Sequence, residues 1–489
     1  MSTNPLIAIC GTTGVGKSKL AVELALRLAQ PALGCKWVGA RVINADAMQV
    51  YRGFNVITNK LSLAERHGVE HLLMDFKDPH EQYIVGEWVR DAMQIIDETH
   101  GRHQVPVLVG GTSYWMQHLI FPNRLVSSTP NGQPLSREIH DALEQSTPNL
   151  RELFASLPDP PPSASDDPDV ALALHDLLAK LDPPIAARWH WRDTRKVLRS
   201  LQIIRDSGRK ASDIIKDQSS TTVVPRYRTL FLWLYADANS LVPRLNARVD
   251  EMLQDGVLEE VKVMKDIATK MALGHGASLD GDVPTSVDST FGIFQSIGFK
   301  ELNRYMCEPC PTERHYQTAV EDMKNANRKY AKRQLSWIRN KLLPAIRASN
   351  SASILSDASH AFVLDATDLE TWASSVRHPA HKISEAFLQG DTLPDPRSLS
   401  GRAQDLLSPS NHPINPLEVL TARRKVVCHV CTMDQTRPVM LEAGREWEAH
   451  QRTKAHNKLL AKRGRTRATD VSTAHDSQIV EGIVAPNIE

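Results

Sequence analysis

Gly11-Thr12-Thr13-Gly14-Val15-Gly16-Lys17-Ser18 decides the fold, because its glycines, lysine and terminal hydroxyl have the spacing of a phosphate-binding loop. An apolar run at residues 6–9 precedes the loop, and a helical pattern at residues 19–26 follows it. This order predicts a buried strand, a loop and a helix. The loop amides and Lys17 would then hold a di- or triphosphate.

A second motif lies about thirty residues further on, at Asn44-Ala45-Asp46-Ala47-Met48-Gln49-Val50-Tyr51. Residues 42–43 read as the next buried strand, so Asp46 would follow the carboxyl end of that strand. Ligands of parallel sheets bind at this edge, which predicts a carboxylate beside the phosphate loop. The alternative for Asp46 is a helix N-cap, a position that Asp favours.

The first half of the chain predicts an α/β fold with a parallel sheet covered by helices. Strand-like runs at residues 6–9, 42–44, 105–109 and 229–235 alternate with helical stretches. We expect three successive regions in the first 375 residues: a P-loop catalytic core (1–121), a helical insertion facing the substrate (122–220), and the remainder of the core with basic helices (221–375).

The C-terminal part predicts a small zinc-binding module. A Pro- and Ser-rich stretch predicts a linker (376–420), and a zinc finger with a basic tail (421–467) and a disordered tail (468–489) would follow. Two cysteines and two histidines have the spacing of a structural Cys2His2 zinc site, with a long central loop: Cys428, Cys431, His450 and His456. The other close cysteine pair, Cys307 and Cys310, lacks matching histidines and reads as a loop.

Composition sets the class of the protein. The 489 residues are 41% hydrophobic and 24% charged, which indicates a folded chain of two to three domains and excludes a disordered one. A net charge of +1 excludes a global basic field, so nucleic-acid binding requires local clusters. No run approaches the roughly 18 apolar residues of a membrane span. Six cysteines and a P-loop near the start favour a cytoplasmic protein, with nucleus or mitochondrion as alternatives, and we expect a monomer.

The joint order of the motifs resembles the tRNA dimethylallyltransferase family over roughly residues 5–345. After the P-loop and the Asp46 motif come segments that resemble the family's at residues 109–114, 195–204, 248–256, 295–301 and 330–334. The C-terminal finger resembles the one found in eukaryotic members. Two departures stand out. Ala47 replaces the usual serine, and His190-Trp191-Arg192-Asp193 keeps only the ends of the usual His-Pro-Asn-Asp.

The resemblance implies that dimethylallyl diphosphate, not a nucleotide, occupies the P-loop. Asp46 would take the proton of an attacking adenine amine, while Thr13, Lys17 and Arg248 stabilise the leaving diphosphate together with Mg²⁺ near Ser18. The implied diphosphate-binding set is Gly11, Thr12, Thr13, Gly14, Val15, Gly16, Lys17, Ser18, Thr112 and Arg244. Arg244 and Arg248 lie four residues apart and share a helix face, and the resemblance favours Arg248. The alternatives are a solvated helix face for the arginines and a plain turn at Thr112.

The resemblance also implies contacts with the anticodon stem-loop of tRNA. Basic residues recur every four positions from Lys324 to Lys332, which predicts a basic ridge along one helix. The implied tRNA-binding set is Asp46, Ala47, Met48, Gln49, Arg195, Lys196, Arg199, Lys324, Arg328, Lys332 and Arg333. A solvated surface helix remains the alternative for both basic clusters.

Two other classes of function share parts of this pattern. A small-molecule or nucleoside kinase would have the same phosphate loop, and Asp237 could then serve Mg²⁺. A non-enzymatic RNA-binding protein would carry a degenerate loop. The intact Lys17, Ser18 and Asp46 speak against the second class.

Overall fold

The computed structural model describes residues 2–30, 36–122, 134–159, 161–220, 224–274, 292–352, 359–408, 424–434 and 437–462. The chain divides into two compact units. The sheet unit comprises Met1–Leu125 and Thr222–His412, and the insertion unit comprises Val126–Thr221 and Pro413–Glu489. The C-terminal segment is thus grouped with the insertion.

A six-stranded parallel sheet forms the centre of the sheet unit, in the order β3-β2-β4-β1-β5-β6. The expected parallel sheet is confirmed. Its strands are β1 (Ser2–Gly11), β2 (Ala40–Asn44), β3 (His71–Leu72), β4 (Val105–Val109), β5 (Tyr227–Tyr235) and β6 (Ser359–Asp365). The sequence analysis did not identify β3 and β6.

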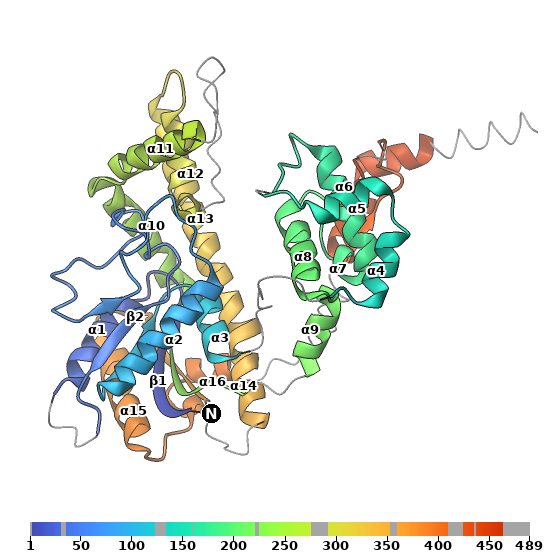
Figure 1. The fold of residues 1–489 in the computed structure, drawn as a ribbon. Helices are drawn as coiled ribbons and strands as arrows, with labels where there is room; N and C mark the ends of the chain where they lie inside the picture. The colour runs from blue at the N-terminus through green and yellow to red at the C-terminus, as the bar shows by residue number, and fades with distance from the viewer. Residues whose placement is uncertain are drawn as a thin grey trace, which may run out of the picture. The chain divides into compact units, whose positions relative to one another are not determined.

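Side chains of β1 alternate between the two faces of the sheet, as strand geometry requires. Leu6 and Ala8 belong to one apolar cluster, and Ile7 and Ile9 belong to the other. Helices α1 (Lys17–Leu28) and α15 (His378–Gln389) cover the second face, while α2 (Val85–Gly101) and α3 (Ser113–Ile120) cover the first (Figure 1). A sheet buried on both faces explains why its central strands read as apolar runs.

The remaining helices of the sheet unit follow β5 and β6 along the chain. They are α10 (Ala238–Gln254), α11 (Val257–Gly274), η2 (Gly292–Gln295), α12 (Phe299–Met306), α13 (Glu313–Trp337), η3 (Ile338–Leu342), α14 (Leu343–Ala352), η4 (Ala373–Arg377), η5 (Pro396–Ser398) and α16 (Gly401–Leu407). None of the described helices combines the length and the apolar character needed to cross a membrane.

Part of the expected linker at 376–420 is a packed helix. The apolar side chains of α15, including Ile383 and Phe387, lie in the core of the second face. Pro379 stands in the first turn of α15, which directly follows the π-helical turn η4. The proline and serine content of residues 376–420 therefore predicted a linker where part of the chain is a packed helix. Residues 409–423 lie outside the described residues.

The insertion unit is a helical bundle with a small hairpin and helix at its C-terminal end. Its elements are α4 (Arg137–Glu144), α5 (Pro148–Ala155), α6 (Pro168–Leu181), α7 (Pro183–Ala186), α8 (Thr194–Ser207), α9 (Ala211–Ser220), β7 (Lys425–Val427), β8 (Met440–Glu442) and α18 (Arg445–Gln451). Leu174 and Leu178 of α6 pack with Val197 and Leu201 of α8 at helical spacing in its core. β7 and β8 pair antiparallel.

Candidate active site and metal centre

The P-loop connects β1 to α1 in a conformation that requires its glycines. Gly16 has a φ of 87° and caps α1. A Cβ at Gly16 would come within 2.7 Å of the Trp372 ring, so only glycine fits under that indole. Amides at the start of α1 are free of helical partners, which favours an anion there. Sequence reasoning did not identify Trp372, because it follows the loop by more than 350 residues.

Lys17 lies folded against its own loop. Its Nζ donates to the carbonyl of Thr12 at 2.8 Å. Burial lowers the pKa of Lys17 to about 8, and nearby Arg248 lowers it further, while the Asp46 carboxylate acts in the opposite direction. A buried amine poised near neutral pH will take up a proton when a polyanion arrives.

Thr13 links the P-loop to two helices that are distant in sequence. Its hydroxyl accepts a hydrogen bond from Nη2 of Arg248 at 2.7 Å, and its amide donates to Oε1 of Gln334 at 2.7 Å. Gln334 in turn donates from Nε2 to the carbonyl of Gly111 at 2.9 Å. Arg248, predicted from the sequence, therefore reaches the loop. Gln334, for which the sequence analysis predicts no role, joins the P-loop to the turn at Gly111.

Asp46 follows β2 in a turn that leaves one carboxylate oxygen directed at the loop after β4. Its Oδ1 accepts from the amide of Met48 at 3.0 Å, and the hydroxyl of Thr112 accepts from the amide of Ala47 at 3.2 Å. Its Oδ2 lies 3.1 Å from the position that a Cβ of Gly111 would occupy. The alternative role of Asp46 as a helix N-cap holds only in part. Its Oδ1 caps this turn by accepting from a backbone amide, but no helix begins there.

A cavity of about 450 Å³ brings these groups together. It is lined by Thr13, Asp46, Ala47, Met48, Ile57, Thr58, Asn59, Gly111, Thr112, Ser113, Tyr114, Arg248, Met252, Gln295, Ser296, Ile297, Asn327, Tyr330, Arg333, Gln334 and Trp337. Burial raises the pKa of Tyr330, and the Asp46 carboxylate raises it further. Burial lowers the pKa of Arg248, against the attraction of Asp46. Cationic, anionic and aromatic groups thus surround one partly apolar space.

Arg244 does not take part in this cavity. Its Nη1 donates to the carbonyl of Ala366 at 2.7 Å, and its Nη2 donates to that of Thr367. These carbonyls follow β6, so Arg244 ties α10 to the sheet. The expectation that Arg244 binds the diphosphate is therefore corrected. Arg244 shares a helix face with Arg248, but its guanidinium group does not reach the cavity that Arg248 lines.

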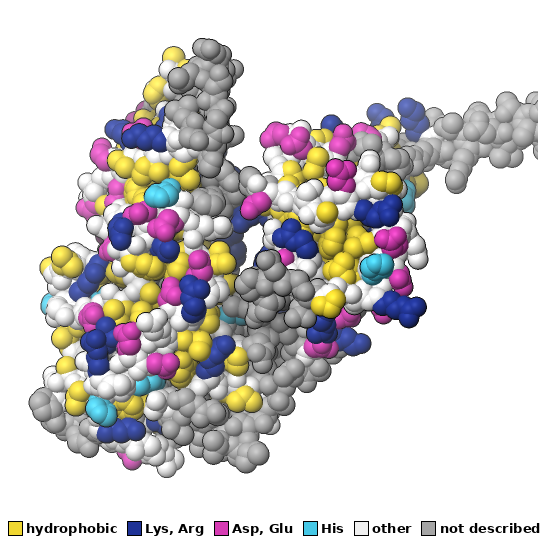
Figure 2. All heavy atoms as spheres, viewed as in Figure 1, with side chains coloured by type: hydrophobic (Ala, Val, Ile, Leu, Met, Phe, Trp, Pro, Cys, Tyr) yellow, Lys and Arg dark blue, Asp and Glu magenta, His cyan; other side chains and the backbone are white. Residues whose placement is uncertain are grey.

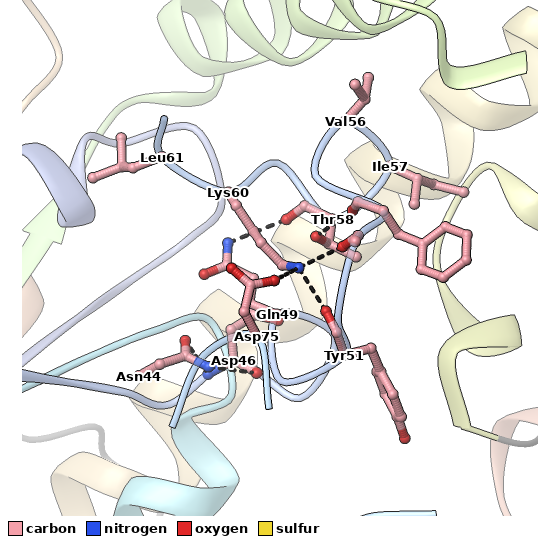
Figure 3. A network of polar contacts seen from close by, with 12 residues as sticks. Asn44, Asp46, Gln49, Tyr51, Val56, Ile57, Thr58, Lys60, Leu61 and Asp75 are labelled. Atoms are coloured by element: carbon pink, nitrogen blue, oxygen red, sulfur yellow. Dashed lines mark hydrogen bonds and ion pairs between the residues drawn. The ribbon is translucent and has the colours of Figure 1, made fainter. Parts of the chain in front are cut away.

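A buried lysine stabilises the segment that follows Met48 and Gln49 by hydrogen bonds to its backbone. The side chain of Lys60 is 1% exposed, and its Nζ donates to the Tyr51 carbonyl at 2.6 Å and to the Asp75 carboxylate (Figure 3). Gln49 donates from Nε2 to the carbonyls of Thr58 and Asn59, both at 3.1 Å. Burial lowers the pKa of Lys60, and Asp75 opposes that shift. Gln49 therefore braces this loop and does not line the cavity.

The expected basic ridge of α13 is partly neutralised. Lys324 lies 2.6 Å from a carboxylate oxygen of Asp250, and Arg328 pairs with Glu321 and donates to Asn246. Lys332 and Arg333 form no ion pair with any described residue. The face of the sheet unit in Figure 2 likewise mixes basic and acidic side chains. Only the C-terminal end of the ridge is thus available for an anionic partner.

The second basic cluster lies on α8 in the insertion unit. Arg195, Lys196 and Arg199 are exposed, and Lys196 pairs with Asp193. They stand on the polar face of a helix whose other face is buried.

Four residues of the C-terminal segment lie close enough together to hold a metal ion. The ligand atoms of Cys428, Cys431, His450 and His456 all lie within 4.8 Å of one another. Nε2 of His450 is 3.2 Å from Sγ of Cys428, and Nδ1 of His456 is 3.5 Å from both sulfurs. Ligands of tetrahedral zinc lie about 3.3 to 3.8 Å apart by ordinary Zn–S and Zn–N lengths, so the donor set fits.

The remaining residues that the sequence analysis considered for metal binding or charge lie in different settings. Cys307 and Cys310 are exposed in a loop, as expected. Asp237 accepts from Tyr235 at 3.1 Å and from Arg402, so its carboxylate is already engaged. Ser18 stands half-buried at the start of α1. The basic run from Arg463 to Arg467 lies outside the described residues.

Comparisons with known proteins agree on one family. The sequence model of the IPP transferase family matches residues 49–341. The tRNA dimethylallyltransferase of Schizosaccharomyces pombe is 35% identical, covering 95% of this chain and 96% of the relative. That of Saccharomyces cerevisiae is 31% identical, covering 94% and 93%. A crystal structure of a eukaryotic dimethylallyltransferase acting on tRNA is similar with a TM-score of 0.67, 28% identity, and coverage of 96% of this chain and 100% of that chain.

Proposed function

Because this chain belongs to the IPP transferase family, we propose that it transfers a dimethylallyl group from dimethylallyl diphosphate to tRNA. The acceptor is N6 of adenosine 37, next to the anticodon, and diphosphate is released. The observation that carries the proposal is the single cavity between the P-loop hydroxyl of Thr13, Arg248 and the carboxylate of Asp46.

Stabilising the leaving diphosphate is the task of the P-loop side of the cavity. The amides of residues 11–18 and the ammonium of Lys17 face the developing negative charge, and Arg248 and the Thr13 hydroxyl add donors. Donors fixed before the reaction are worth about 3 to 4 kcal/mol each in the barrier. Ser18 would hold a Mg²⁺ ion, which supplies further charge neutralisation when bound.

Accepting the proton of the adenine amine is the task of Asp46. One oxygen is held by the Met48 amide, so the other is free to accept from the substrate as the carbon–nitrogen bond forms. The apolar lining of the same cavity, which includes Met252, Ile297 and Trp337, suits the dimethylallyl group. Thr112 orients the Asp46 turn from the opposite loop.

Binding of the anticodon stem-loop would use the end of α13 and the exposed face of α8. In this proposal the phosphate contacts come from five basic residues: Lys332, Arg333, Arg195, Lys196 and Arg199. The flipped base would contact Met48 and Ala47, which line the cavity. Lys324 and Arg328 contribute less, since each already has an acidic partner. We also propose a cytoplasmic monomer that binds one structural Zn²⁺, which a metal analysis of the purified chain would test.

The kinase alternative is disfavoured by Asp237, whose carboxylate is engaged by Tyr235 and Arg402. Phosphorus NMR separates the two activities in one sample. The proposal expects diphosphate release from dimethylallyl diphosphate that depends on unmodified tRNA, with ATP and GTP left intact. Consumption of ATP or GTP without that release would favour the kinase.

A further inference from the structure

The C-terminal finger is packed onto the helical insertion within the insertion unit. Trp191 of the insertion is 1% exposed, and its Nε1 donates to the carbonyl of Pro438 in the finger at 2.9 Å. The amide of Lys425, at the start of β7, donates to the carbonyl of Ala187 at 2.6 Å. A buried indole with a satisfied N–H is an anchor of the kind that fixes two surfaces in one geometry.

This packing creates a cavity of about 370 Å³ with walls from both parts. The insertion supplies Ser165, Trp191 and Arg192, and the finger supplies Arg437. The Arg192 guanidinium lies over the Trp191 ring, 5.0 Å from its centroid. Both arginines are exposed, and neither forms an ion pair with a residue in the described ranges.

We propose that this cavity binds a phosphate of the tRNA backbone, held between Arg192 of the insertion and Arg437 of the finger. The inference rests on the proposed function, which makes tRNA the substrate. Guanidinium groups match phosphate oxygens in a two-donor fork, and the Ser165 hydroxyl is a further donor on the same wall. The indole holds Arg192 in place, so less side-chain entropy is lost when the phosphate binds.

The cavity requires both parts of the insertion unit, because its two arginines come from the helical insertion and from the finger. Arg437 lies between Cys431 and Pro438, so folding of the finger around its metal and docking on Trp191 bring it to Arg192. The two residues that depart from the family's usual His-Pro-Asn-Asp, Trp191 and Arg192, are the two that build this site from the insertion side.

Binding of unmodified tRNA across a salt series, measured by fluorescence anisotropy with the full chain, tests the proposal. Arg192→Gln and Arg437→Gln are each expected to weaken binding several-fold and to lower the slope of log affinity against log salt by roughly 0.7 to 1. Arg452→Gln is the matched control. Arg452 is an exposed finger arginine outside the cavity, so affinity and slope stay at wild-type values.

Further arms separate the possible outcomes. Arg192→Lys keeps the charge but loses the fork, so its affinity should fall between those of the wild type and Arg192→Gln. Zinc content and thermal unfolding check that each variant is folded. Wild-type affinity and slope in both glutamine variants would overturn the inference, even if inorganic phosphate still competes at the cavity. Dimethylallyl transfer by the wild type is measured in parallel: transfer with unchanged binding in the variants refutes only this site, whereas no transfer refutes the proposed function.

Discussion

Arg248 on α10 donates a hydrogen bond to the hydroxyl of Thr13 in the P-loop at 2.7 Å, across 235 residues of sequence. This contact places a guanidinium beside the phosphate loop, near enough to Lys17 for its charge to lower the pKa of that amine. A diphosphate bound at this loop would meet both cations, and the Asp46 carboxylate lines the same cavity as Thr13 and Arg248.

Replacing Arg248 tests this clamp. We expect Arg248→Gln to lower kcat/KM for dimethylallyl diphosphate by about 10²- to 10³-fold, because one fixed donor to the leaving group is lost. Arg244→Gln is the contrasting variant: it should lower the Tm, since two carbonyls after β6 lose their donor, with kcat/KM close to wild type. A large loss of kcat/KM in Arg244→Gln with an unchanged Tm would contradict this assignment.

The pH dependence should report the buried amine of Lys17. Burial lowers the pKa of Lys17 to about 8, so the free enzyme loses this positive charge as pH rises through that value. We expect kcat/KM for dimethylallyl diphosphate to fall above about pH 8. Without ligand, the unfolded chain binds the proton more tightly between about pH 8 and 10.5, so the free energy of unfolding should rise over that range.

A profile of kcat/KM that stays flat to pH 10 would contradict the prediction for Lys17. Lys17→Arg supplies the control, because arginine stays protonated throughout. Any activity that this variant retains should lack the alkaline fall.

Gly111 permits the close approach of three catalytic-site side chains. A Cβ there would come within 2.6 Å of Nε2 of Gln334 and 3.2 Å of the Tyr330 hydroxyl. We expect Gly111→Ala to lower kcat/KM by at least about tenfold, because small displacements of reacting groups are costly. In Gly86→Ala, where the added methyl meets nothing within 4 Å on α2, activity should be unchanged and stability higher by about 0.5–1 kcal/mol.

Lys60 should matter for tRNA more than for dimethylallyl diphosphate. In Lys60→Met the Asp75 carboxylate and the Tyr51 carbonyl lose their donor, so we expect the free energy of unfolding to fall by roughly 2 kcal/mol. The loop that carries Met48 loosens, which should raise KM for tRNA with little change in KM for dimethylallyl diphosphate.

Arg52→Gln is the control for Lys60 in the same segment. The Arg52–Asp78 ion pair has side chains that are 59% and 45% exposed, so its loss should change stability by less than about 0.5 kcal/mol. Equal effects of the two substitutions, measured by denaturant unfolding, would refute the role of the buried amine.

Local patterns were enough to predict the sheet and the family. The P-loop and the apolar runs of β1, β2, β4 and β5 are contiguous in sequence, and their order identifies a parallel α/β fold, which the structure and the comparisons confirm. β6 was missed because its apolar run is only four residues long, from Ala361 to Leu364, and its partner strand lies far away in the chain.

The periodicity of the sequence did not predict which side chains of distant elements contact one another. Helical spacing correctly put Arg244 and Arg248 on one face of α10, but only tertiary packing decides that one meets the P-loop and the other the end of β6. Likewise, the basic pattern of α13 gave no sign that Asp250 of α10 lies beside Lys324. The role of Gln334 as a link between loop and turn is a tertiary property of the same kind.

Mass spectrometry of nucleosides from tRNA incubated with the protein, Mg²⁺ and dimethylallyl diphosphate tests the central claim most directly. The account predicts an adenosine heavier by one dimethylallyl group with the wild type, and loss of that product in Asp46→Asn with tRNA binding retained. An unmodified adenosine from wild-type reactions, or full-rate transfer by Asp46→Asn, would contradict it.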